Sequence, residues 1–126
     1  MSDIADAAEL LETARETLLS AVLPELGSDR RYDALMIANV LATAAREFRL
    51  GATARSDEAR RLRQQLADAG IQQPAEALVE LRRAIRTAIR AGAFDEQARG
   101  RELTRDLLDT ASERVRISNP KALREP

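Results

Sequence analysis

Three polar side chains spaced four residues apart are the first candidates for chemistry in this sequence. Asn39 and Thr43 interrupt the apolar stretch ALMIANVLATAA at residues 34–45, and Glu47 follows it. Residues four apart lie on one face of a helix, so the three form a single polar band. The band could hydrogen-bond a neighbouring helix, because an unsatisfied buried polar group costs about 1–3 kcal/mol. It could instead form the polar wall of a ligand pocket.

An arginine near the end of the chain is the predicted partner of this band. Arg114 projects between Leu103 and Leu107, on a helical stripe that is otherwise apolar. An arginine at the edge of a core either extends into solvent or pairs with a carboxylate. We expect Glu47 to supply that carboxylate. The candidate ligand or interface residues are therefore Asn39, Thr43, Glu47 and Arg114.

A run of arginines in LRRAIRTAIR, residues 81–90, is the second candidate. On a helical wheel these side chains occupy one sector about 100° wide beside an apolar stripe. Guanidinium groups can bind phosphates or carboxylates through two hydrogen bonds. The same pattern is typical of a solvated face, which would be dispensable for stability. The anion-binding candidates are Arg82, Arg83, Arg86 and Arg90.

The residue composition gives little support for a catalytic site or a metal site elsewhere in the chain. The chain has no cysteine and no histidine, so thiolate and imidazole ligands and the commonest general base are absent. The acidic residues fall on two faces that we expect to be solvated, namely Glu9, Glu12 and Glu16, and Asp106, Asp109 and Glu113. We predict no catalytic residue, metal or cofactor, and favour a non-enzymatic protein.

The charge balance argues against binding to nucleic acid or membranes. The formal net charge is −1, from 20 basic and 21 acidic residues, and aromatic residues make up only 2%. Such a chain has neither a positive field for phosphates nor a platform for stacking bases. It shows no signal-peptide pattern and no apolar run of about 18 residues, the length of a membrane span. We expect a cytoplasmic protein, and the abundance of Ala and Arg beside a single lysine suggests a GC-rich bacterial genome.

Helical spacing of apolar residues, with start and stop signals, predicts an all-α bundle of about five helices without strands. The expected helices cover residues 3–23, 29–50, 56–70, 74–92 and 95–117. Pro74 opens the fourth, and Gly51 is expected to end the second in a left-handed conformation. Gly100 should weaken the fifth by about 1 kcal/mol relative to alanine. We expect one domain over residues 1–126, with 118–126 as a C-terminal tail.

The second predicted helix is apolar on more than one side. Ile37, Leu41 and Phe48 form one face, and Tyr32, Leu35 and Met36 partly cover the opposite side around Asn39. A helix of this kind is central to its bundle or packs against a second chain. We therefore predict that this helix is central and that the protein is a homodimer. Asn39 should be buried, with its amide bonded to another helix or to the second subunit.

Several short patterns resemble an uncharacterised family of small all-helical bacterial proteins, described only as a domain of unknown function. They are Ala38-Asn39 with Leu41, Arg46-Glu47 with Leu50-Gly51, Ile89-Arg90 with Gly92, and Arg114-Val115 with Ile117 and Asn119-Pro120. The resemblance implies genomic neighbours that are aminoglycoside-phosphotransferase-like kinases and acyl-CoA dehydrogenases. It also implies a helper role in a catabolic or acyl-CoA-linked pathway.

Two functions remain open from the sequence. The first is a non-enzymatic interaction or accessory module that self-associates or docks on a partner enzyme, such as a kinase-like or acyl-CoA dehydrogenase-like protein. The second is a binding protein or weak enzyme for an anionic or acyl ligand. Its pocket would lie between helices and be lined by Asn39, Glu47 and an arginine.

Overall fold

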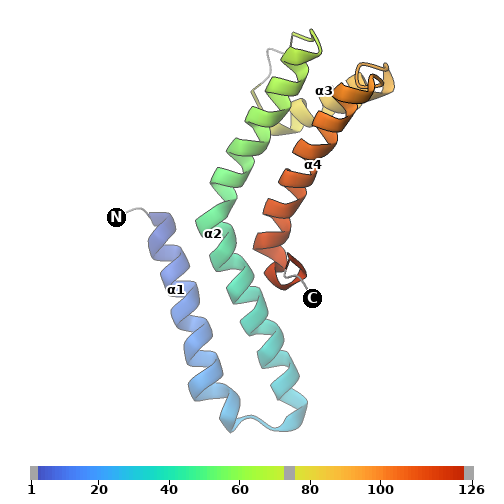
Figure 1. The fold of residues 1–126 in the computed structure, drawn as a ribbon. Helices are drawn as coiled ribbons and strands as arrows, with labels where there is room; N and C mark the ends of the chain where they lie inside the picture. Colours follow the sequence, from blue (N-terminus) through green and yellow to red (C-terminus); the bar gives the residue numbers. More distant parts are fainter. Residues whose placement is uncertain (1–2, 73–75, 124–126) are drawn as a thin grey trace. The chain divides into compact units, whose positions relative to one another are not determined.

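The chain consists of α-helices joined by short turns. The computed structural model describes residues 3–72 and 76–123, and these ranges contain no strand. The four α-helices of the described residues are α1 (Asp3–Thr17), α2 (Ser28–Asp68), α3 (Leu78–Arg90) and α4 (Gln97–Ser118) (Figure 1). A π-helical turn (Leu18–Val22) and a 3-10 turn (Leu23–Glu25) follow α1, and a second 3-10 turn covers Pro120–Leu123. The all-α prediction is confirmed, but five helices is one too many for this part of the chain.

The second and third predicted helices are one continuous helix. α2 runs from Ser28 to Asp68 and passes through Gly51. The glycines with a left-handed backbone in the described residues are Gly70 and Gly92, so Gly51 keeps a helical conformation. A glycine inside a helix costs about 1 kcal/mol relative to alanine, which weakens a helix without ending it. The predicted stop at Gly51 is therefore wrong.

Most of the other predicted helix ends agree with the structure. Gly70 and Gly92 have φ of 76° and 86° and follow α2 and α3, as expected for left-handed C-terminal glycines. Asn119-Pro120 follows α4, and the predicted C-terminal tail, residues 118–126, includes the last residue of α4 and the 3-10 turn at Pro120–Leu123. The predicted start at Pro74 lies outside the described residues.

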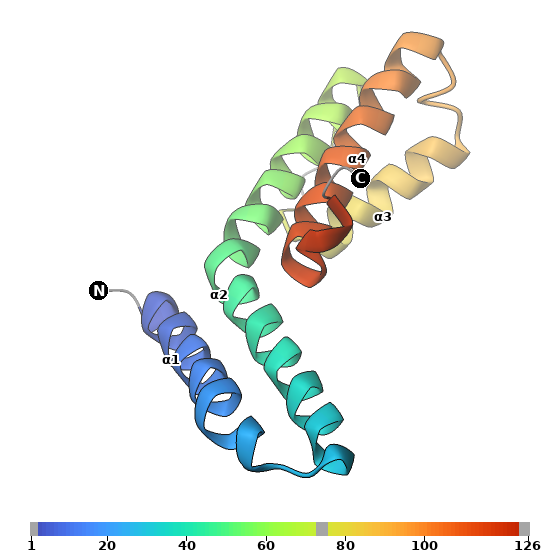
Figure 2. The same cartoon turned by 60° about the horizontal axis from the view of Figure 1, so that its bottom comes forward.

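The chain forms two compact units, which we describe separately. Unit 1 comprises Met1–Ala52 and Arg116–Pro126, and unit 2 comprises Thr53–Val115. In unit 1, α1 lies antiparallel beside the first half of α2 (Figures 1 and 2). The buried apolar residues of unit 1 are Ala8, Ala34, Ala38, Ala45 and Ile117. Because four of these five are alanines, the helices can approach closely, but little apolar surface is buried.

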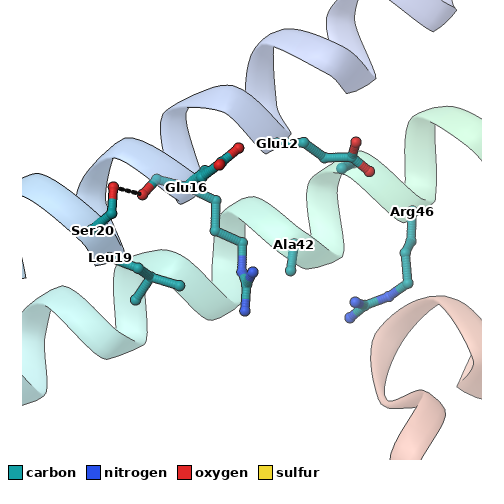
Figure 3. Close-up of a pocket in the computed structure, with 8 residues that line it drawn as sticks. Glu12, Glu16, Leu19, Ser20, Ala42 and Arg46 are labelled. Atoms are coloured by element: carbon teal, nitrogen blue, oxygen red, sulfur yellow. Dashed lines mark hydrogen bonds between the residues drawn. The ribbon is translucent and has the colours of Figure 1, made fainter.

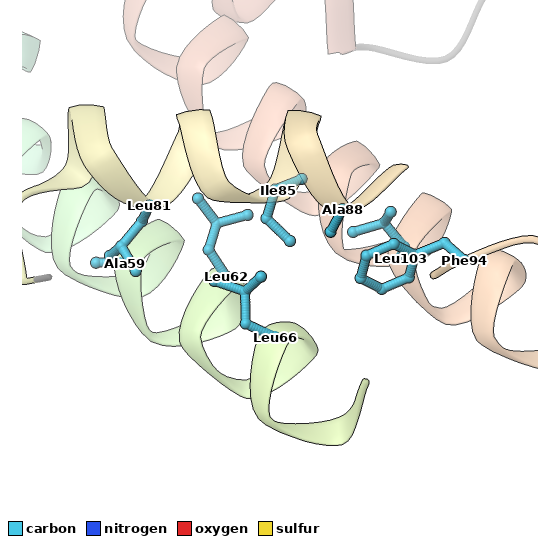
Figure 4. Close-up of a cluster of buried hydrophobic side chains, with 8 residues drawn as sticks. All are labelled: Ala59, Leu62, Leu66, Leu81, Ile85, Ala88, Phe94 and Leu103. Carbon is cyan, nitrogen blue, oxygen red and sulfur yellow. The ribbon is translucent and has the colours of Figure 1, made fainter. Parts of the chain in front are cut away.

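Unit 2 has the larger aliphatic core. Its buried cluster comprises Ala59, Leu62, Leu66, Leu81, Ile85, Ala88, Phe94 and Leu103, from α2, α3, the turn after α3, and α4 (Figure 4). Leu66 and Leu81 are only 1% and 0% exposed. The α2 and α3 members recur every three or four residues, as expected for the buried stripe of an amphipathic helix.

Gly100 occupies a position in α4 where a side chain would collide with the backbone. A Cβ atom there would lie 2.9 Å from the carbonyl oxygen of Phe94. We therefore expect Gly100→Ala to lower the free energy of unfolding by about 1–3 kcal/mol, the usual penalty for overpacking. Helix propensity alone predicts the opposite sign, a gain of about 1 kcal/mol. Urea unfolding followed by circular dichroism measures the difference, and a more stable variant would contradict this explanation.

Candidate functional site

The polar band on α2 lies on an exposed face of unit 1. Asn39 is exposed, and the Thr43 hydroxyl donates a hydrogen bond to its backbone carbonyl oxygen at 3.0 Å. The neighbouring Tyr32, Leu35 and Met36 are 68%, 47% and 46% exposed. The prediction that the chain itself buries Asn39 and this face is therefore wrong. Burial in unit 1 is concentrated on the alanine positions of α2, and most of the larger apolar residues of this part of α2, though not Leu41, are exposed.

Arg46 has a structural role that the sequence analysis did not assign. Its Nε atom donates to the carbonyl oxygen of Ile117 at 2.6 Å, and a terminal guanidinium nitrogen donates to the Thr43 hydroxyl at 3.2 Å. Ile117 lies in the last turn of α4, where carbonyl groups lack helical partners and the helix dipole is negative. Arg46 therefore caps α4. Arg46 and Ile117 both belong to the short patterns that resemble the uncharacterised family. These patterns were the one sequence signal that could have pointed to the contact between them.

An open pocket of about 670 Å³ lies between α1 and α2 in unit 1 (Figure 3). Its charged lining residues are Glu12, Glu16, Arg15 and Arg46, so the formal charges balance. Glu12 also accepts two hydrogen bonds from Arg49, one of them 3.0 Å long. This acidic residue thus forms an ion pair between the helices and is only half exposed. With no excess charge, the pocket does not favour a cation or an anion.

Glu58 is the centre of a charged cluster in unit 2. It is 6% exposed and accepts two hydrogen bonds from Arg82, at 2.8 and 2.7 Å. Arg114 donates a third bond, also to Oε1, at 2.8 Å. The structure thus gives Arg114 a carboxylate partner, as predicted, but the residue is Glu58. The nominated Glu47 belongs to unit 1 and is exposed.

The arginine sector of α3 is divided by this cluster. Arg83, Arg86 and Arg90 are exposed, whereas Arg82 is directed to Glu58 and its side chain is 37% exposed. The prediction that the whole sector is solvated is therefore wrong for Arg82, and the prediction that these arginines are dispensable for stability stays a prediction. A helical wheel cannot separate these residues, because Arg82 lies beside the apolar stripe and only the position of Glu58 on α2 distinguishes it.

A second set of polar contacts joins α2 to α4 within unit 2. Arg61 donates to Glu113 at 2.7 Å, and the Gln65 amide donates to Asp106 at 2.9 Å. The side chains of Arg61 and Glu113 are only 16% and 20% exposed, and their hydrogen bond raises the pKa of the Arg61 guanidinium. The prediction that Asp106 and Glu113 are solvated is wrong, since both contact α2.

The described residues meet the requirements of neither a metal site nor a membrane-spanning helix. Within residues 3–72 and 76–123, no three acidic side chains are grouped as ligands for a metal ion. No helix in this part of the chain is long and apolar enough to cross a membrane.

Comparison with known families places this arrangement in context. A family model described as a domain of unknown function, DUF6285, matches residues 24–122. The chain belongs to the DUF6285 family. The DUF6285 match includes α2, α3 and α4 and every candidate residue from Asn39 to Arg114, but it begins after α1. No curated protein and no solved structure shows significant similarity to the chain. The predicted resemblance to an uncharacterised family is confirmed.

Proposed function

We propose that this protein is a non-enzymatic helical interaction module that self-associates through an exposed face of α2. The α2 apolar face consists of Tyr32, Leu35, Met36 and Val40, which are 68%, 47%, 46% and 63% exposed. Residues 32, 36 and 40 follow one another at helical spacing, and Leu35 lies beside them. This row of exposed apolar side chains is the observation that carries the proposal, because monomeric proteins rarely leave large contiguous apolar patches in water.

The composition of the α2 apolar face suits a second copy of the chain. Tyrosine and methionine are enriched at protein interfaces, and the face has no charged residue among its four members. Two copies related by a two-fold axis would pack their α1–α2 pairs as a four-helix bundle. Asn39 would then lie inside the interface, where one buried amide can fix the register of two helices, as it does in coiled coils. Thr43 and Glu47 would continue this polar band at its edge.

Docking on a partner enzyme is a second use of the same face. The resemblance noted from the sequence implies a kinase-like or acyl-CoA dehydrogenase-like partner. A surface that binds such a partner would share the apolar centre and polar rim of a dimer interface. Co-purification of the wild-type protein with the kinase encoded beside it tests this form of the proposal.

A charge placed on the α2 apolar face should abolish self-association. We expect Val40→Arg to give the mass of one chain at every concentration, because a dimer would have to bury an unpaired guanidinium. The wild-type protein should give the mass of two chains in light scattering across a concentration series. Leu108→Arg is a matched control on α4, since Leu108 is 62% exposed and Val40 is 63% exposed.

The Leu108→Arg control should keep the mass of two chains. A monomeric wild-type protein at all concentrations would contradict self-association. If Leu108→Arg separates the chains and Val40→Arg does not, the interface lies in unit 2 instead.

A further inference from the structure

We propose that a groove beside Glu58 in unit 2 binds a small aliphatic carboxylate. The head group would contact Arg86 and Arg114, and the aliphatic part would lie on the apolar wall between α3 and α4. This inference is independent of self-association, since it concerns other residues of the chain.

The groove has the size and lining of a small-molecule site. Its volume is about 510 Å³, within the range of about 300–1,000 Å³ that is usual for ligand pockets. Leu62 and Ile85 form a floor that is almost fully buried, at 3% and 4% exposure. Ile89 and Leu107 also line the groove and are both 42% exposed. These two side chains present apolar surface to solvent that an aliphatic chain would cover.

The charges around the groove favour an anion. Three arginines, Arg82, Arg86 and Arg114, line it, and Glu58 is the one acidic lining residue. Arg82 uses two hydrogen bonds on Glu58, whereas Arg114 donates one and its side chain is 55% exposed. Arg86 forms no ion pair with any residue that the structure describes. Three arginines against one carboxylate leave a net formal charge of +2 among the lining residues, beside an apolar wall.

The arginines and the apolar wall of the groove together favour a ligand that has both a carboxylate and an aliphatic chain. A carboxylate already contacts Arg114 at 2.8 Å, so the guanidinium is held where it can bind that group. An aliphatic carboxylate would place one negative charge at the arginines and methylene groups on Ile89 and Leu107. Inorganic phosphate could satisfy the arginines but would leave this apolar surface in water. A neutral alcohol of equal length would cover the surface and leave the arginines without an anion.

Calorimetric titration of the full chain with octanoate and decanoate, both below their micelle concentrations, tests the proposal. Decanoate should bind about 15-fold more tightly than octanoate, because it has two more methylenes and each buried methylene contributes about 0.8 kcal/mol. 1-Octanol should bind at least about tenfold more weakly than octanoate, because a hydrogen bond to a charged group is stronger than one between neutral groups. Inorganic phosphate alone should give no saturable heat.

Two variants of α3 test where the carboxylate binds. Arg86→Gln should weaken decanoate binding about tenfold through loss of a charged contact. Arg90→Gln, the same change on an exposed arginine one turn away, should leave the dissociation constant unchanged. Circular dichroism of both variants confirms that they fold.

Four results would overturn the proposal. They are an absence of saturable binding at millimolar decanoate, equal affinity for octanol and octanoate, binding of phosphate without binding of decanoate, and equal weakening by both variants. A partner protein in the groove would give the first of these results. None of these four results would change the masses expected for the wild-type protein and Val40→Arg. The carboxylate-binding proposal and the self-association proposal can therefore fail separately.

Discussion

Replacing Leu81 with alanine should lower the free energy of unfolding by about 2–5 kcal/mol, the range for removing a fully buried leucine side chain. Leu81 is 0% exposed and belongs to the cluster that contains Leu62, Leu66 and Leu103, from two other helices. The surrounding helices cannot fully close the cavity, so both the lost transfer energy and the cavity contribute. Urea unfolding monitored by circular dichroism gives this difference.

Val79→Ala is the matched control on the same helix. Val79 is 61% exposed, and an apolar truncation at such a position is expected to change stability by no more than about 0.5 kcal/mol. Equal effects of the two substitutions would contradict the assignment of Leu81 to the core of unit 2.

Removing the Glu58 carboxylate should have the second-largest effect. We expect Glu58→Ala to lower the free energy of unfolding by about 2–3 kcal/mol, because Arg82 and Arg114 lose their shared partner. The expected value is below the 3–5 kcal/mol of a fully buried pair, since these side chains are 37% and 55% exposed and are partly screened by water. Glu102→Ala removes the same charge from an exposed position on α4 and should change stability by no more than about 0.5 kcal/mol.

A double-mutant cycle separates the ion pair from other effects of the substitution. Glu58→Ala combined with Arg82→Ala should be less destabilising than the sum of the two single changes, because the double variant leaves no arginine at position 82 without its carboxylate. Additive effects would show that the pair with Arg82 contributes nothing to the stabilisation by Glu58, which would then come from Arg114 and from packing. Arg90→Ala, on an exposed position of α3, should add independently to Glu58→Ala.

Local sequence patterns predicted the helix ends well where the residues themselves restrict the backbone conformation or favour a left-handed one. Gly70 and Gly92 adopt the left-handed conformation that ends a helix, and Asn119-Pro120 follows α4 as expected. Gly51 has the same residue type but no such conformation, because the cost of glycine in a helix is small beside the interactions made by the residues on either side. Whether a glycine ends a helix therefore depends on packing that a local pattern does not contain.

The candidate residues show a similar limit. A helical wheel placed Arg114 correctly at the edge of an apolar stripe, but it could not choose between Glu47 and Glu58 as its partner. One sequence signal could have helped, since Glu58 lies in line with Leu62 and Leu66 at intervals of four, and these residues are buried. An acidic residue on a buried stripe requires a charged partner. The exposure of the α2 apolar face was not predictable, because the pattern shows which residues are apolar and not which of them another helix covers.

Spin labels beside the α2 apolar face can show whether two chains meet through it. The chain has no cysteine, so Glu47→Cys can carry a single label on an exposed position at the edge of the face, where it replaces no residue inside the interface. Pulsed electron paramagnetic resonance should then detect a defined distance between the labels of two chains. Dilution with unlabelled protein should reduce this signal, and the additional change Val40→Arg should abolish it. Labels at position 47 that show no coupling, in a sample whose mass is that of two chains, would contradict an interface at this face.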